Sequence, residues 1–569
     1  MFTILSRVLL RGSACMVALL IATHAARAGS TLAPPATTPT SVQLSDVLAL
    51  AHKADGTVKP PASRVEHGLD SAWGMKGSYS LLDSGDDYRY SYDLSKLRWD
   101  GGQTGGQGWQ RDENGQVTLL HDTSASDFAP AAGYLGYPAS ELKLLGESAD
   151  GAYVVQVDHP YSHRRWLFFD KKTGLLVRQE VGYPDARRTF TYSDFRKTDG
   201  CVDAWHVHAT TGVTQNDYDL VTTSIRYGAA VGTGALAIPS SDYSLVQFPS
   251  GSNVVALPSR MVSKSGSTKY YTVDNPNKDI DMPGDMSSVY SVQTRADPHI
   301  LVQLTIQGKG YDFYLDSGAS GVFIDSSLAA KLGLETFGPS EQNQFGQWVK
   351  GYALLPEVSV GGITVKNLIA ATLPGWDASQ PGVDIVGLVG YDFIANAVLA
   401  IDYEKGTVTA TNPLTFEPPA DGVALPIALD DGVPYITVQI GQTQADRFVV
   451  DTGSPNCFLA AGFAKAHPED IKDQGVGGGV DRIWLPYYGF SGVGGDVSVR
   501  ATEVKTLAIS GVSLSEWIMF QDINDDGSDL WYDGLIGADF LKYFTVYLDY
   551  PQNEIFLVPN ALGRAKAGA

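Results

Sequence analysis

The sequence contains two stretches that match without a gap, GLVGYDFIANAVLAIDY at 387–403 and GLIGADFLKYFTVYLDY at 534–550. Both begin with Gly-Leu-x-Gly-x-Asp-Phe and both end in Asp-Tyr. Self-similarity of this kind indicates that the second half of the chain is duplicated. A shorter marker agrees, because Val-Ala-Leu-Pro occurs at 255–258 and again at 423–426.

Between these markers, each copy carries an aspartate followed by a hydroxyl residue and glycine. YDFYLDSGAS at 311–320 corresponds to DRFVVDTGSP at 446–455, so Asp316 aligns with Asp451. Each Asp follows an aromatic or β-branched run typical of a strand. Each is also followed, about 70 to 85 residues later, by an apolar pair and a glycine. One such triplet is usually a plain turn, but two in matched contexts indicate a functional pair.

This doubled arrangement resembles the aspartic proteases of the pepsin and retropepsin type, over about residues 253–559. The resemblance implies a mainly β fold, with two homologous β-barrel-like lobes that each supply one aspartate. It also implies that each apolar-apolar-Gly segment runs beside its own Asp loop. The activity implied is that of an exported aspartic endopeptidase, which acts on a protein or peptide substrate and needs no cofactor and no metal.

The chemistry explains why two copies are needed. Two carboxylates held close together cannot both ionise readily, so they share a proton. One can then accept a proton from water while the other donates one to the scissile carbonyl. We therefore predict that Asp316 and Asp451 are catalytic. By the family pattern, the two hydroxyls bond across to the opposite loop and the glycines allow close approach, which gives four support residues: Ser317, Gly318, Thr452 and Gly453.

The two copies differ just after these triplets. Ala319 follows the first and Ser454 follows the second. In this family a hydroxyl at that place can bond the outer carboxylate oxygen and favour its charged form. The resemblance therefore favours Asp316 as the protonated member of the pair.

A cleft that closes over substrate needs a flexible hairpin, which glycine permits. FGQWVKGYA at 345–353 offers Trp348 and Tyr352 in the first lobe, and FSGVGGDVSV at 490–499 is the candidate in the second. The alternative is that these are two exposed hairpins without a gating role. The flap candidates in the second lobe are Gly492, Gly494 and Gly495.

Three other patterns receive structural interpretations. Asp392 and Asp539 are duplicated too, but each is well placed to cap a short helix. DINDDGSDLWYD at 522–533 has the spacing of a calcium loop but lacks flanking helices, so an acidic surface loop is favoured. His206 and His208 share a strand face without an evident third metal ligand.

Composition places the protein among exported globular chains. Residues 1–28 have the basic, apolar and small-residue segments of a signal peptide. They contain three arginines and no acids, so the formal charge of −22 becomes −25 on their removal. Such a surface repels phosphate backbones, which argues against nucleic-acid binding. No later apolar run is long enough to span a bilayer, so we expect a periplasmic or secreted protein without an integral membrane segment in the mature chain.

Residues 29–240 form a separate region. Apolar spacing predicts a helix at 42–54, and alternating runs such as 165–181 predict hairpins of one curved antiparallel sheet over about 60–235. The sheet texture loosely resembles the half-barrel domains of lipoprotein-sorting proteins, which implies possible lipid or substrate docking. A chaperone-like or inhibitory module without a ligand is the alternative.

The expected order is thus a signal peptide at 1–28, this sheet domain, a first lobe at 241–415 and a second lobe at 416–569. The Val-Ala-Leu-Pro marker lies 58 residues before the Asp in the first copy and 25 in the second, which predicts an insertion near 259–297. A non-catalytic peptide- or lipid-binding protein on a protease scaffold remains the rival hypothesis, because fold alone does not exclude it.

Overall fold

The computed structural model describes residues 33–56, 62–120, 137–158, 164–182, 187–232, 234–241, 245–263, 298–342, 348–373, 385–430, 432–474, 488–492, 495–522 and 532–567. The mainly β fold that the sequence predicts is confirmed. The chain forms two compact units, one with its main part up to residue 242 and a piece at 337–351, the other with the rest from 243 onward. Among the helices in the described ranges, none is long and apolar enough to cross a membrane.

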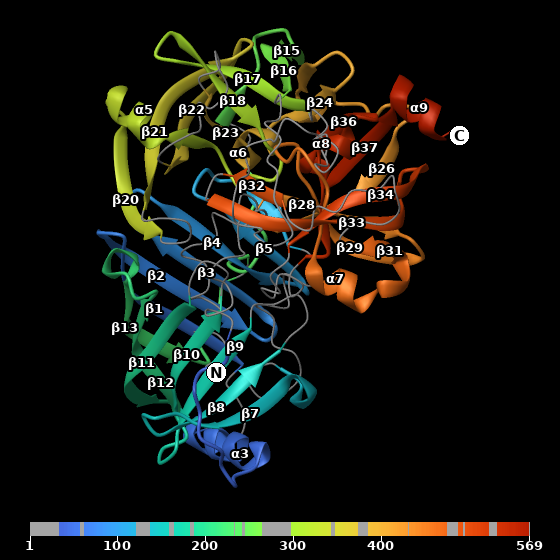
Figure 1. Cartoon of the computed structure of the whole chain (residues 1–569). Coiled ribbons are helices and arrows are strands. Elements are labelled where there is room, and N and C mark those ends of the chain that lie inside the picture. Colours follow the sequence, from blue (N-terminus) through green and yellow to red (C-terminus); the bar gives the residue numbers. More distant parts are fainter. Residues whose placement is uncertain are drawn as a thin grey trace. The chain divides into compact units, whose positions relative to one another are not determined.

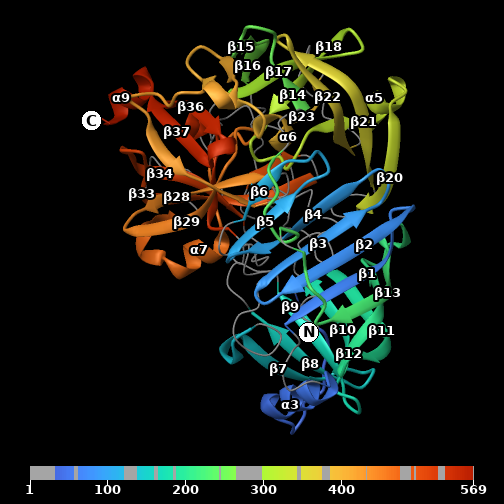
Figure 2. The same ribbon diagram turned by 180° about the vertical axis from the view of Figure 1, so that it is seen from behind.

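The first unit is built on a thirteen-stranded antiparallel sheet, preceded by helix α3 (Leu44–Ala54) (Figures 1 and 2). The strands form two meanders, β1 to β6 and β7 to β13, which are joined where β1 pairs with β13, so β6 and β7 lie at opposite edges of the sheet. The predicted helix, hairpin and curved-sheet region are confirmed. The strands are β1 (Ser63–Ala72), β2 (Met75–Ser84), β3 (Asp87–Asp93), β4 (Arg98–Thr104), β5 (Gln107–Arg111), β6 (Val117–Leu119), β7 (Leu142–Glu147), β8 (Ala152–Val157), β9 (Arg165–Asp170), β10 (Leu176–Gly182), β11 (Arg187–Thr198), β12 (Cys201–Thr210) and β13 (Tyr218–Tyr227).

One face of this sheet forms an apolar core against α3. Val47 and Ala51 of the helix are fully buried against aromatic and aliphatic side chains of the strands. The same unit buries an ionic group, in which Arg64 pairs with Glu66 and with Asp203 (3.5 Å). A buried arginine between two carboxylates is stable only as a group, so each member depends on the others.

The second unit contains two closed six-stranded barrels with the same strand order, although the first four residues of β21 belong to the piece at 337–351. In the first barrel β22 pairs with β21 to close the path β22-β19-β23-β18-β17-β21. In the second barrel β28 pairs with β33 to close the path β28-β29-β35-β30-β34-β33. The barrel strands are β17 (Pro298–Ile306), β18 (Lys309–Leu315), β19 (Phe323–Asp325), β21 (Trp348–Val360), β22 (Ile363–Leu373) and β23 (Ile385–Val389), then β28 (Val433–Ile440), β29 (Thr443–Val450), β30 (Phe458–Leu459), β33 (Gly495–Ile509), β34 (Val512–Asp522) and β35 (Gly534–Ile536).

Shorter strands and helices flank the barrel strands. Strand β16 pairs with β17, and β27 pairs with β28 at the matching place. The predicted insertion lies mostly outside the described residues, since 264–297 follow β16 directly. These elements are β14 (Val246–Gln247), β16 (Ser259–Ser263), β20 (Glu335–Gln342), β27 (Ala428–Asp430), β31 (Ile471–Gln474), β32 (Tyr488–Gly492), α5 (Ser326–Lys331), α6 (Tyr391–Ile394), α7 (Ala461–Ala466), α8 (Ala538–Leu541) and α9 (Ala561–Ala567).

A six-stranded sheet joins the two lobes. Its order is β15-β25-β24-β36-β37-β26, so three strands from each copy meet where β24 pairs with β36. Both Val-Ala-Leu-Pro markers fall on its edge strands, β15 and β26. The symmetric order shows that the repeat read from the sequence is a repeat of structure. Its strands are β15 (Val254–Leu257), β24 (Val398–Asp402), β25 (Thr407–Thr411), β26 (Val423–Pro426), β36 (Phe544–Asp549) and β37 (Glu554–Pro559).

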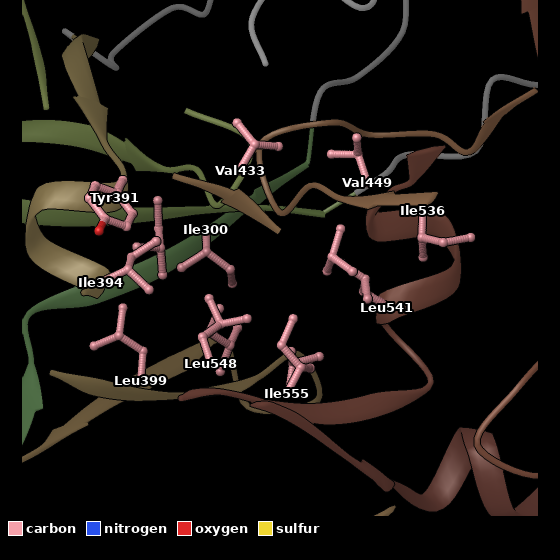
Figure 3. Close-up of a cluster of buried hydrophobic side chains, with 14 of the residues drawn as sticks. Ile300, Tyr391, Ile394, Leu399, Val433, Val449, Ile536, Leu541, Leu548 and Ile555 are labelled. Atoms are coloured by element: carbon pink, nitrogen blue, oxygen red, sulfur yellow. The ribbon is translucent and has the colours of Figure 1, made fainter. Parts of the chain in front are cut away.

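One continuous apolar core runs through both lobes. Figure 3 shows Ile300 and Leu399 of the first lobe in the same cluster as Val449 and Leu548 of the second. The two lobes therefore share one closely packed core, and the loops that follow its strands are anchored to it.

Candidate active site

The two Asp loops follow equivalent strands of the two barrels. Asp316 comes directly after β18, and Asp451 comes directly after β29. The N–H of Asp316 donates to the carbonyl of Val389 (2.9 Å), and the N–H of Asp451 donates to that of Ile536 (3.0 Å). β18 pairs in parallel with β23, and β29 with β35. Each apolar-apolar-Gly segment therefore runs beside its own loop.

The two aspartates meet where the lobes join. A Cβ added to Gly318 would lie 2.6 Å from Cγ of Asp451, and one added to Gly453 would lie 2.4 Å from Cγ of Asp316. These separations leave no room for any side chain, so both turns need glycine. The two carboxyl groups are also hydrogen-bonded to each other. The structure thus brings together the pair that the repeat singles out.

The hydroxyl residues of the triplets bond across to the opposite loop. Ser317 Oγ donates to the carbonyl of Val450 (2.8 Å), and Thr452 Oγ1 donates to that of Leu315 (2.8 Å). Each hydroxyl also accepts the other residue's backbone N–H, at 2.9 and 3.0 Å. Four fully buried hydrogen bonds therefore tie each loop to its counterpart.

Removing one of these hydroxyls should loosen both loops. In Thr452→Val the N–H of Ser317 and the carbonyl of Leu315 lose their partner inside the protein. An unsatisfied buried group costs about 1–3 kcal/mol, so we expect the free energy of unfolding to fall by about 2–4 kcal/mol. Denaturant unfolding measures this. Thr437→Val is the matched control, because the hydroxyl of that exposed threonine bonds an exposed partner, Asp446 (3.1 Å); an equal loss in both variants would contradict the prediction.

Both carboxyl groups of the pair have raised pKa values, because burial disfavours their charged forms. Burial, the charge of Asp451 and the hydrogen bond to it raise the pKa of Asp316 well above its ordinary value. Burial raises the pKa of Asp451, whereas hydrogen bonds from Asp316 and from two backbone N–H groups lower it. The resulting pKa is about 6. The two N–H donors are Gly453 (2.8 Å) and Ser454 (2.9 Å). The directions of these two pKa shifts favour Asp316 as the residue that carries the shared proton.

This assignment agrees with the sequence expectation, but the reason differs. The hydroxyl of Ser454 donates to the carbonyl of Asn456 (2.9 Å) instead of to Asp451. The backbone N–H of Ser454 bonds Asp451 instead, but Gly318 and Ala319 bond Asp316 in the same way, so the charge of Asp451 and not these bonds distinguishes the two aspartates. A serine in a turn commonly bonds backbone two residues on, and that local bond takes the hydroxyl away from the carboxylate.

A tyrosine that the sequence analysis did not single out supports the first loop. Tyr550, the last residue of the second repeat, donates its hydroxyl to the carbonyl of Ser317 (3.2 Å) in the opposite lobe. Tyr403 ends the first repeat and is also buried, but its hydroxyl has no hydrogen-bond partner among the described residues. The conserved spacing of the two Asp-Tyr pairs within the repeat was the available signal. The two copies therefore support their loops unequally.

The prediction that Asp392 and Asp539 cap short helices is wrong. Each lies inside the first turn of its helix, which begins after a glycine that makes no side-chain cap. Asp392 instead accepts the N–H of Val322 (2.7 Å), and Asp539 accepts the thiol of Cys457 (2.9 Å). They connect each helix to the chain just after the Asp loop, because burial requires these carboxylates to find a donor.

The flap candidates are placed only in part. Gly492 pairs with Gly495 across the β32–β33 hairpin, while Gly494 lies outside the described residues. Trp348 begins β21, and Tyr352 is four residues further along the same strand. These positions are those of two hairpins. That the hairpins close over a substrate stays a prediction.

Two discounted metal patterns can also be placed. The calcium-like stretch falls mostly outside the described residues, and Asp533, its last position, accepts the N–H of Arg447 (3.2 Å). His206 and His208 both bond Asp219 (2.8 and 3.0 Å), a partner that sequence reasoning missed because it lies on the neighbouring strand β13.

Residues 302–393 match the protein-family model described as Aspartyl protease. This range contains Asp316 and ends within the first repeated segment. No match was found among curated proteins. The protease-like character predicted for the second half of the chain is therefore confirmed over residues 302–393.

Solved structures similar to parts of the chain are of two kinds. A putative outer membrane lipoprotein-sorting protein domain from Vibrio parahaemolyticus is 11% identical with a TM-score of 0.26, covering 34% of this chain and 97% of that structure. A LolA superfamily protein from Nitrosomonas europaea is 14% identical with a TM-score of 0.26, covering 35% and 98%. Conglutin gamma from lupine seeds is 10% identical with a TM-score of 0.31, covering 56% and 97%.

Proposed function

We propose that the chain is an exported aspartic endopeptidase that hydrolyses peptide bonds through Asp316 and Asp451. The observation that carries this proposal is the reciprocal pair of loops, in which each glycine leaves room for the opposite carboxyl group. A purely structural junction would not need two adjacent acids whose charged forms are both disfavoured by burial. The four crossed hydrogen bonds hold these acids in place before substrate arrives.

The proton assignment gives each aspartate a role. The Asp451 carboxylate accepts a proton from water while the oxygen of that water attacks the peptide carbonyl carbon. The Asp316 carboxyl donates its proton to the carbonyl oxygen, which yields a neutral tetrahedral diol. Collapse of the diol breaks the C–N bond, and the departing nitrogen takes a proton from Asp451. Asp316 recovers its proton from the diol, so the pair returns to its starting state.

The pH dependence follows from the same assignment. Asp451 must be ionised to act as the base, and its pKa is about 6. We expect kcat/KM to rise about tenfold per pH unit below pH 6 and to level off above it. Digestion of an unfolded protein by the mature chain from pH 3 to 8, with and without pepstatin, measures this. An optimum below pH 4 would overturn the roles assigned to the two aspartates.

The same digestion separates the endopeptidase from its rival. A chain that cleaves no unfolded protein at any of these pH values, but still binds peptide, would be a binding protein on a protease scaffold. Export to the periplasm or medium through residues 1–28 belongs to the proposal, as does docking of lipid or substrate at the N-terminal sheet. The presence of a processed chain outside the cytoplasm would support the first of these.

A further inference from the structure

A cluster of metal-binding side chains lies in the second lobe, in the turn that follows α7. Its members are His467, Glu469 and Asp470, and one ligand atom from each lies within 4.8 Å of the other two. Asp470 is buried, whereas Glu469 is largely exposed and His467 is intermediate. The cluster therefore combines one buried carboxylate with a histidine and a glutamate that solvent can reach.

The position of Asp470 is fixed by the neighbouring β28–β29 turn. Its Oδ1 accepts the N–H of Gln442 (2.8 Å), and a Cβ on Gly441 would lie only 2.2 Å from that same oxygen. Gly441 also has φ of +55°, a conformation that favours glycine. The other oxygen, Oδ2, is buried and has no hydrogen-bond partner within the described part of the chain. A buried carboxylate oxygen left in this way costs free energy unless a cation or a proton satisfies it.

The histidine is held beside this carboxylate by its own contacts. The ring centroid of His467 lies 4.6 Å from that of Phe463, and the backbone N–H of His467 donates to the carbonyl of Phe463 (2.9 Å). Nδ1 of His467 lies 3.5 Å from Oε1 of Glu469 and 3.5 Å from Oγ1 of Thr443. These separations are longer than ordinary hydrogen bonds. Two ligands bound tetrahedrally to one zinc ion at about 2.0–2.1 Å lie about 3.4 Å apart.

We propose that His467, Glu469 and Asp470 bind one zinc-like divalent cation. Imidazole nitrogen with two carboxylate oxygens is a ligand set suited to Zn²⁺, and Mg²⁺ prefers all-oxygen sites. The ion would satisfy Oδ2 of Asp470 and would tie the turn after α7 to the β28–β29 turn. This proposal does not depend on whether the aspartate pair is catalytic.

The cluster of His206, His208 and Asp219 in the first unit serves as an internal contrast. There the imidazole nitrogens approach the carboxylate at 2.8 and 3.0 Å, which are hydrogen-bond distances. Both histidines use the same oxygen of Asp219. The side chains of this cluster satisfy one another, so it provides a control that also contains histidine and aspartate.

Zinc titration of the full mature chain tests the site. After treatment with EDTA and dialysis, calorimetry with ZnCl₂ should give one saturable site per chain, and MgCl₂ should give none. The double variant His467→Gln/Glu469→Gln should weaken Zn²⁺ binding by at least about a hundredfold, which is the loss of two of three ligands. The variant His206→Gln/His208→Gln should bind as the wild type does.

Melting temperature provides a second readout and a folding control. Bound metal stabilises only the folded state, so zinc should raise the melting temperature of the wild type and of the His206→Gln/His208→Gln variant, but not of the His467→Gln/Glu469→Gln variant. Without zinc, that variant should melt close to the wild type, because Glu469 is exposed. The proposal is overturned if no saturable Zn²⁺ site is found, if both double variants bind equally well, or if only the His206→Gln/His208→Gln change removes binding.

Discussion

Replacement of Asp451 by Asn is expected to abolish peptide hydrolysis while leaving the protein folded. Asn cannot accept the proton of the attacking water, so the reaction loses its general base. General acid–base catalysis contributes about 10²–10⁴-fold, and we expect kcat/KM to fall by at least about 10³-fold. Because Asn keeps an oxygen where Asp451 accepts the N–H groups of Gly453 and Ser454, the loop geometry should persist. The measurement is cleavage of an unfolded protein or a fluorogenic peptide at pH 6 to 7.

The matched control for this change lies on β29, the strand that precedes Asp451. Asp446 is five residues before Asp451 and is exposed, and among the described residues its side chain bonds Thr437 (3.1 Å) and Gln444 (2.9 Å). Asp446→Asn should retain full activity. Asp316→Asn should lose activity as Asp451→Asn does, because the other carboxyl alone cannot serve as both acid and base. If Asp451→Asn and the control cleave at the same rate, the aspartate pair is not the catalytic group.

The same substitution is expected to stabilise the protein at pH 8. The pKa of Asp451 rises from an ordinary 3.8 to about 6 on folding, so the folded state binds this proton more tightly than the unfolded state does. The free energy of unfolding therefore decreases as pH rises from about 4 to 6 and stays lower above. Asn carries no charge, so it removes this penalty. We expect a gain of about 2–3 kcal/mol at pH 8 and almost none at pH 4.

Denaturant unfolding of wild type, Asp451→Asn and Asp446→Asn at both pH values measures this effect. The difference between the wild type and Asp451→Asn should grow from pH 4 to pH 8, and the difference between the wild type and Asp446→Asn should not. If Asp451→Asn is less stable than the wild type by the same amount at both pH values, the charged form of Asp451 does not destabilise the folded state. A catalytic group that costs stability is a common feature of enzyme sites.

The repeat made the site predictable from sequence to an unusual degree. In both copies, a strand that ends in Asp-Ser-Gly or Asp-Thr-Gly pairs in parallel with the apolar-apolar-Gly segment of its own lobe. Asp316 and Asp451 therefore occupy equivalent places in the two lobes, which is how the repeat predicts that they approach each other. The crossed hydroxyl bonds of Ser317 and Thr452 follow from the family pattern in the same way. The crossed bonds join residues 133 and 137 positions apart, and they could be predicted because the same short pattern occurs twice.

Other features that depend on partners distant in sequence could not be read in this way. The bond from Cys457 to Asp539 joins residues 82 positions apart, and nothing local to either residue indicates the other. The link from Tyr550 to Ser317 spans 233 positions and both lobes. The third member of the histidine cluster, Asp219, is a cross-strand neighbour. The local sequence around each of these residues does not predict its partner, because the pairings form only when the barrels and sheets close.

The sheet that joins β24 to β36 has a consequence for how the protein behaves on dilution. Two-lobed sites can also be assembled from two separate copies of a half, and such sites disappear when the copies dissociate. Here both halves belong to one chain, so the effective concentration of one Asp loop at the other is set by the fold and not by the amount of protein present. The specific activity of this chain should therefore be the same at nanomolar as at micromolar concentration.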